Sequence, residues 1–199
     1  MPKSNRRIQH DVYGTKPRKP GINSYVKGAN NERVCAQFFT DWTGQPFARV
    51  PRSGGLNWKN TARVQGDIIC EDDTFDFPFV VETKHKIMSL SSNKDGKMRE
   101  GTILINFWEQ NQRDALVIKK IPILLVRKHK MKVTKNELGQ KNGLYYVYLE
   151  EKHGKKLSQI FNIPRLNYFL YRDKLIEGFN SAEILKNVDY FKFTDYVTT

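Results

Sequence analysis

Two carboxylates and a lysine stand at the ends of two short apolar runs. Asp67 precedes the first run, residues 68–70, and the second run, residues 77–84, closes with Glu82 and Lys84. Because side chains alternate between the two faces of a strand, Glu82 and Lys84 point to the same face. If the two runs pair as an antiparallel hairpin, Asp67 lies beside Glu82. The spacing therefore predicts that all three charged groups meet in one place.

Carboxylates this close repel each other unless a cation lies between them. A hard divalent cation such as Mg²⁺ takes oxygen ligands of this kind, so we expect Asp67 and Glu82 to bind a metal ion, with Lys84 beside a metal-bound water. The alternative is an exposed Glu82–Lys84 ion pair, which would contribute less than ~1 kcal/mol. The apolar residues before Glu82 favour a strand that is buried on both faces, where a charge pair requires a reason.

Five segments in order resemble the PD-(D/E)XK nuclease superfamily. They are Asn31-Glu32-Arg33 in a first helical stretch, Pro51-Arg52-Ser53-Gly54-Gly55, Asp67 with Glu82-Thr83-Lys84, Trp108-Glu109-Gln110 in a later helical stretch, and the apolar run 121–126. Together they are similar to the branch that contains Holliday junction resolvases and many bacteriophage members. The resemblance covers residues 27–127. Gly66 stands before Asp67, where the motif that names the superfamily has proline.

The resemblance implies an α/β fold with a restriction-endonuclease-like core, in which helices flank a central mixed β-sheet, and an additional C-terminal α/β element. We expect a basic N-terminal arm over residues 1–26, the nuclease core over residues 27–127, and an extension packed on the core over residues 128–199. A chain of 199 residues suits one domain with an appended element. The arm could close on DNA phosphates, be a solubilising tail, or be exchanged in a dimer.

The resemblance also implies roles for single residues in a metal site. Asp67 and Glu82 would hold the metal together with the backbone carbonyl of Thr83, and Lys84 would position the attacking water. The expected cofactor is Mg²⁺, for which Mn²⁺ can substitute. The carboxylate of Glu32 would support this site directly or through water.

Helical spacing predicts the elements that carry the two outer site residues. Apolar residues recur over residues 27–42, with Gly44 placed to end the helix, and again over residues 98–118. Glu32 lies on the first helix, and its alternative role is that of a carboxylate favoured by the helix dipole. Gln110 lies on the second helix, which in the resembled family covers the active-site sheet, and we expect it to orient the substrate.

A segment rich in proline and glycine, residues 45–60, is a candidate DNA contact. Glycine allows backbone amides to approach a phosphate, and arginine binds a phosphate through a planar fork. We predict that Arg49, Arg52, Ser53 and Gly54 contact the DNA backbone; the alternative is a hairpin turn with incidental charges. Lys86, in a loop expected over residues 85–97, is a further predicted DNA contact.

The composition favours an anionic partner. The formal net charge is +13, with 34 Lys and Arg against 21 Asp and Glu, and nucleic acid is the simplest partner for such a chain. The two cysteines are typical of a reducing compartment. There is no apolar run of the ~18 residues needed to span a membrane and no signal peptide, so we expect a cytoplasmic protein without a membrane partner, in the host cytoplasm if the chain is viral.

Two later stretches carry weaker predictions. The aromatic run 144–149 predicts a strand whose tyrosines pack in the core; base stacking is the alternative. Residues 152–199 read as mixed helical sequence.

The predicted function is that of a metal-dependent DNA endonuclease. The first-ranked form of this function is a structure-selective Holliday junction resolvase acting in DNA recombination or repair. Because a resolvase makes two matched cuts, this function requires a homodimer. The alternatives are a nuclease for duplex, flapped or nicked DNA, and a basic DNA-binding protein whose nuclease-like site is inactive.

Overall fold

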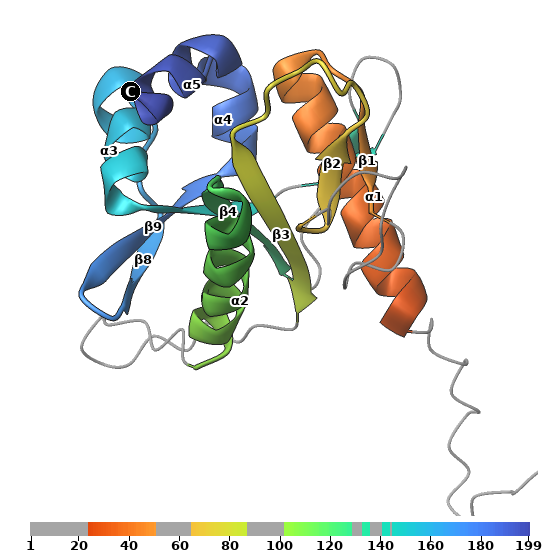
Figure 1. The fold of residues 1–199 in the computed structure, drawn as a ribbon, viewed down its shortest axis with the longest axis horizontal. Coiled ribbons are helices and arrows are strands. Elements are labelled where there is room, and N and C mark those ends of the chain that lie inside the picture. The colour runs from red at the N-terminus through yellow and green to blue at the C-terminus, as the bar shows by residue number, and fades with distance from the viewer. Residues whose placement is uncertain (1–23, 51–64, 87–101, 129–132, 136–140, 144) are drawn as a thin grey trace, which may run out of the picture.

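A computed structural model describes residues 24–50, 65–86, 102–128, 133–135, 141–143 and 145–199 (Figure 1). The helices are α1 (Ser24–Thr43), α2 (Thr102–Ile118), α3 (Glu151–Ile160), α4 (Ser181–Asn187) and α5 (Tyr190–Thr198). The strands are β1 (Phe47–Arg49), β2 (Ile68–Cys70), β3 (Phe79–Lys86), β4 (Ile121–Lys128), β5 (Val133–Lys135), β6 (Lys141–Gly143), β7 (Tyr146–Glu150), β8 (Asn167–Tyr171) and β9 (Lys174–Asn180).

Seven strands form one mixed sheet in the order β1-β2-β3-β4-β7-β9-β8, and β5 pairs with β6 separately. Strands β3 and β4 are parallel, and every other pair in the large sheet is antiparallel. A parallel pair needs a crossover connection, and α2 is the helix in that connection. The predicted fold class, a mixed sheet flanked by helices, is confirmed.

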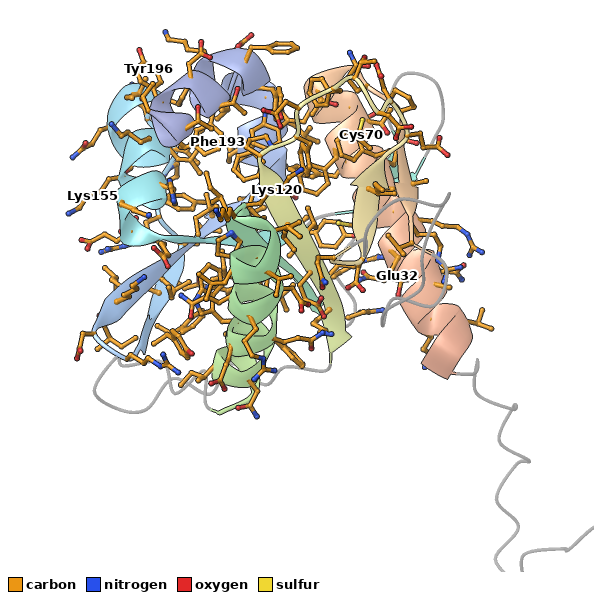
Figure 2. All side chains as sticks on the ribbon, viewed as in Figure 1. Glu32, Cys70, Lys120, Lys155, Phe193 and Tyr196 are labelled. Atoms are coloured by element: carbon orange, nitrogen blue, oxygen red, sulfur yellow. The ribbon has the colours of Figure 1, made fainter. Side chains whose placement is uncertain are left out.

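Helices cover both faces of this sheet. Side chains of α1, α3, α4 and α5 pack with one face in the larger apolar cluster, which contains Phe38, Phe39 and Phe193. Phe193, labelled in Figure 2, is a fully buried contribution of α5 to this cluster. On the other face, α2 packs Leu104 and Trp108 against strands β4 and β7. Strand β3 therefore lies between two helical layers, as a doubly covered central strand should.

The first helix forms where apolar spacing predicted it, and it is three residues longer at its beginning and one at its end. Cys35, Phe38 and Phe39 are fully buried on its inner face. Gly44 ends the helix in the left-handed region, with φ of 74°, and its N–H donates to the carbonyl of Thr40 at 2.9 Å.

Two predictions about local structure are wrong. The stretch 152–199 is not only helical, because β8 and β9 form a hairpin that continues the same sheet beyond β7. Along β8 the side chains alternate between buried and exposed, which is the strand period that the helical interpretation overlooked. The loop expected from residue 85 begins later, since His85 and Lys86 still pair with β4 as part of β3.

Strand β7 confirms the aromatic strand predicted over residues 144–149. Tyr145, just before it, and Tyr148 within it are fully buried, as the core interpretation requires. The division of the chain into arm, core and extension stays a prediction. Within the described residues, no helix has both the length and the apolar character to span a membrane.

Gly66, which precedes Asp67, lies close to the backbone of strand β3. Its φ is 88°, and a Cβ built there would lie 2.8 Å from the carbonyl oxygen of Val81 and 3.2 Å from Cγ1 of Val80. Gly44 has a similar φ of 74° but nothing within 4 Å of such a Cβ. A side chain at Gly44 would therefore cost backbone strain alone, whereas a side chain at Gly66 would cost backbone strain and a steric clash.

We expect Gly66→Ala to be more destabilising than Gly44→Ala. The Gly44 variant should lose about 1–2 kcal/mol, the cost of a left-handed conformation for an L-residue. The Gly66 variant should lose more, because β3 backbone must also move. Urea unfolding of both variants measures the difference, and equal losses would show that the close approach to Val81 has no energetic weight.

Candidate active site

The β2–β3 hairpin brings Asp67 and Glu82 together. Ile68 pairs with Val81, so Asp67 stands opposite Glu82 in the antiparallel register. The Asp67 N–H donates to the Val81 carbonyl at 2.8 Å, and the Thr83 N–H donates to Oδ2 of Asp67 at 2.9 Å. The Asp67 carboxylate is therefore held on the β3 backbone, as the sequence spacing predicted.

Glu82 and Lys84 form an ion pair on the face that α2 covers. Glu82 and Lys84 pair in register with Leu124 and Val126, which pack in the α2 cluster. The Glu82 side chain is 2% exposed and the Lys84 side chain 25%. The alternative of an exposed surface pair is therefore wrong, because the carboxylate is buried.

The backbone of Thr83 points to the same edge of β3 as Asp67. In an extended strand the N–H and C=O of one residue point to the same side. Since the Thr83 N–H donates to Asp67, the Thr83 carbonyl is directed to the side where Asp67 lies. Two carboxylates and this carbonyl are oxygen donors of the kind that hard divalent cations bind, so the predicted metal ligands fit their role.

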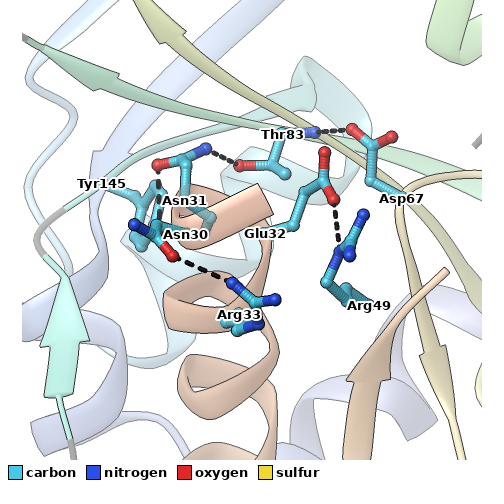
Figure 3. A network of polar contacts seen from close by, with 8 residues as sticks. All are labelled: Asn30, Asn31, Glu32, Arg33, Arg49, Asp67, Thr83 and Tyr145. Atoms are coloured by element: carbon cyan, nitrogen blue, oxygen red, sulfur yellow. Dashed lines mark hydrogen bonds and ion pairs between the residues drawn. The ribbon is translucent and has the colours of Figure 1, made fainter. Parts of the chain in front are cut away.

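A buried hydrogen-bond network holds Thr83 on the face of the sheet that α1 covers, opposite the face that α2 covers (Figure 3). Asn31 Nδ2 of α1 donates to Thr83 Oγ1 at 2.8 Å, and the Tyr145 hydroxyl donates to the Asn31 carbonyl at 3.0 Å. All three residues are buried. In the sequence, Asn31 stands out only as part of a motif. The network joins positions 52 and 114 residues apart, so no local pattern indicates it.

Glu32 is engaged by an arginine. Its Oε2 lies 2.9 Å from Nε of Arg49 on β1, and both side chains are largely buried. Figure 3 shows this pair on the same side of Thr83 as Asp67. Among the described residues, no three His, Cys, Asp or Glu side chains are grouped as a metal site. The roles of Glu32 at the metal and of Arg49 on DNA stay predictions.

Helix α2 contributes one acidic residue that the sequence analysis missed. Burial raises the pKa of Asp114, the nearby Asp67 carboxylate raises it further, and Arg113 and Lys84 lower it. Asp114 therefore lies within electrostatic range of Asp67 and Lys84. Gln110, the predicted substrate contact, is half-buried one helical turn before it. The i, i+4 spacing from Gln110 is the signal that could have found Asp114.

Burial and a neighbouring like charge shift the pKa of Glu82. Burial is the larger cause and the Asp67 carboxylate the next, and together they raise the pKa of Glu82 to about 7 although Lys84 lowers it. A cation between Asp67 and Glu82 would favour the ionised form and reverse this shift. Such a cation would also relieve the repulsion between the two carboxylates.

The other predicted DNA contacts lie mostly outside the described residues. This holds for Arg52, Ser53 and Gly54, and for the side chain of Lys86, whose backbone ends β3.

The fold and the site together define a class of protein. A mixed sheet with helices on both faces, a central strand that carries Glu82-Thr83-Lys84 and an aspartate on the adjacent strand are the features of restriction-endonuclease-like nucleases. The family model described as "Phage putative PDDEXK endonuclease" matches residues 23–185, and the chain belongs to this family. No curated protein and no solved structure matches the chain.

Family membership confirms the PD-(D/E)XK resemblance and its phage members, whereas the Holliday junction branch stays a prediction. Membership of this nuclease family implies DNA as the substrate, and PD-(D/E)XK nucleases generally use divalent metals. The match begins before α1 and ends within α4, so it includes the β7-β9-β8 part of the sheet.

We expect Glu82→Gln to change how the stability of the metal-free protein depends on pH. The pKa of Glu82 rises from 4.5 to about 7 on folding, so between these values the folded protein keeps a proton that the unfolded chain has lost. Stability is therefore lost as the pH rises through this window. Glutamine does not titrate, so the variant should gain stability relative to the parent between about pH 5 and pH 8.

Chemical unfolding in EDTA at several pH values measures this difference. A divalent cation added at about pH 8 should then stabilise the parent and not the variant, because only the parent keeps both carboxylates. A difference between the two proteins that does not change with pH would contradict the buried environment described for Glu82.

Proposed function

We propose that this protein is a Mg²⁺-dependent DNA endonuclease that cuts branched DNA, and specifically a Holliday junction resolvase. The observation that carries the chemistry is the buried pair of carboxylates, Asp67 and Glu82, held opposite each other by the hairpin and by the Thr83 amide. The position of Lys84 beside Glu82 supports a hydrolytic role, since it puts a cation where charge develops on a phosphate.

In this proposal, Asp67, Glu82 and the Thr83 carbonyl hold Mg²⁺. The bound ion would lower the pKa of a water molecule and neutralise charge on the scissile phosphate. Lys84 orients that water and donates to a phosphoryl oxygen in the transition state. Gln110, on the helix above, contacts the substrate, and Glu32 supports the site through water while Arg49 holds its carboxylate.

In this proposal, the residues that bind DNA differ from the residues that catalyse its cleavage. The net charge of +13 attracts the phosphate backbone, and such binding depends on Lys and Arg rather than on two buried carboxylates. Arg49, Arg52, Ser53, Gly54 and Lys86 are the proposed backbone contacts. The two functions should therefore separate by mutation.

Asp67→Asn and Glu82→Gln should each reduce cleavage at least ~100-fold, as loss of groups that hold the metal or act on the reacting phosphate does, and leave DNA binding within a few-fold. Glu177→Gln is the matched control. Glu177, on β9, is also a buried carboxylate, and its cationic partner Arg165 lies 2.9 Å away. Single-turnover cleavage and an electrophoretic binding assay measure the two properties. Cleavage at the parental rate by either site variant would rule out the proposed mechanism.

The choice of substrate rests on the family branch that the sequence resembles. Resolution of a four-way junction needs two active sites related by a two-fold axis, so the proposal includes a homodimer. A nuclease for duplex, flapped or nicked DNA would use the same residues. A DNA-binding protein without activity would keep the basic surface and make no use of Asp67 and Glu82.

End-labelled four-way junction, flap and duplex DNA, each with Mg²⁺, Mn²⁺ or EDTA, distinguish these functions. We expect symmetric cuts confined to the junction that require the metal, from a protein that sediments as a dimer. Cutting of flap or duplex DNA alone would keep the chemistry and remove the resolvase assignment. Tight binding without any cleavage would leave only the DNA-binding function.

A further inference from the structure

Strand β8 is an edge of the large sheet that lacks the usual protection against pairing with another strand. It is last in the strand order, and within the described part of the chain no strand pairs with its outer edge. Its five residues, Asn167–Tyr171, include no charged residue and no proline. Natural edge strands are commonly short, charged or interrupted by proline. Strand β1, at the opposite edge, follows this rule, since it has three residues and one of them is Arg49.

One face of β8 is also apolar and exposed. Leu166, Tyr168 and Leu170 are 48%, 49% and 63% exposed. Helix α3 packs on β7 and β9, where Leu157 of α3 and Phe179 of β9 lie in the larger apolar cluster, but it leaves this face of β8 uncovered. An exposed apolar stripe on an unprotected edge strand is typical of a surface that pairs with another strand.

The sequence of β8 suits antiparallel pairing with a second copy of itself. A two-fold axis perpendicular to the sheet places residues of the same face opposite each other. If the axis passes beside Phe169, the central residue, all five residues of one strand pair with all five of the other. Tyr168 then lies opposite the partner's Leu170, and the two-fold axis repeats this contact. The exposed apolar side chains of both copies therefore form one stripe.

The charges beyond the two ends of the strand are complementary in the same register. Arg165 and Asp173 each lie four residues from Phe169, so Arg165 comes opposite the partner's Asp173. Asp173 is exposed in the turn between β8 and β9. The Arg165 side chain is 44% exposed, and its pair with Glu177 uses Nη1, which leaves other N–H groups of the guanidinium for a second carboxylate. A shift of the register in either direction would separate the two charges.

We propose that β8 is the interface of a homodimer, in which two copies pair antiparallel around Phe169 and continue the sheet across the two-fold axis. Backbone hydrogen bonds join the two strands. The contacts between Tyr168 and Leu170 bury the exposed stripe, and the pairs of Arg165 with Asp173 set the register. A second copy is the occupant because the strand complements itself in length, apolar pattern and charge. The inference rests on the proposed function only for the expectation of a homodimer.

Leu170→Lys tests this interface by analytical ultracentrifugation of the full chain without DNA. Position 170 is exposed, so the monomer should fold, whereas the dimer loses an apolar contact from each copy. We expect the dissociation constant of the dimer to rise at least ~100-fold. Leu116→Lys is the matched control, because Leu116 is 71% exposed and lies on α2. The control variant should sediment as the parent does.

Disulfide cross-linking tests the register and does not depend on the lysine variant. A mixture of Tyr168→Cys and Leu170→Cys chains should form a disulfide between the two variants. Each variant alone should form none, because neither position lies opposite itself. The native Cys35 and Cys70 are buried and should not compete.

Equal dimer affinity of the two lysine variants would overturn this interface and leave the nuclease proposal intact. A disulfide formed by either cysteine variant alone would overturn the pairing around Phe169. A monomeric parent would overturn the interface and the homodimer together, whereas metal-dependent cleavage of flap or duplex DNA would still identify the nuclease. A monomeric parent that loses affinity for single-stranded DNA on Tyr168→Ala would overturn the proposal in favour of DNA binding by β8.

Discussion

The constraint on which the structure depends is the burial of two like charges beside each other. Asp67 and Glu82 stand opposite each other on adjacent strands, and Glu82 is almost completely buried. Burial of a carboxylate is unfavourable unless charge partners and hydrogen bonds compensate it. The Thr83 N–H and the Lys84 ammonium provide part of that compensation. The remaining cost has to be offset by apolar packing elsewhere in the chain.

Both faces of β3 contribute to that packing, and they differ in what they do for the site. The α1 face is aromatic and fixes the strand, since Thr83 is bonded to Asn31, which Tyr145 holds in turn. The α2 face carries the charged side chains and the helix that covers them. Strand β3 is therefore held on one face by a buried hydrogen-bond network and carries its charged side chains on the other. Gly66 completes this arrangement by allowing the chain to pass close to Val81 before it reaches Asp67.

Local patterns in the sequence predicted the hairpin, the first helix and the aromatic strand over residues 144–149, because each depends on the spacing of apolar residues within one segment. The same patterns missed the β8–β9 hairpin, whose alternation was read as helical. They could not find the Asn31–Thr83 bond or the Glu32–Arg49 pair, which join different elements through the tertiary fold. Asp114 is intermediate, because helical spacing from Gln110 places it on the right face but only the packing of α2 on β3 brings it near Asp67.

The charge distribution favours an enzyme over a protein that only binds DNA. A pure DNA-binding surface gains nothing from Asp67, Glu82 and Asp114, because carboxylates repel phosphates and Glu82 in addition is costly to bury in its ionised form. With a divalent cation the same groups reverse their effect: the carboxylates are compensated, and the phosphate meets a positive centre beside Lys84. In the proposed function, metal binding and the approach of the scissile phosphate would therefore be coupled through one set of charges.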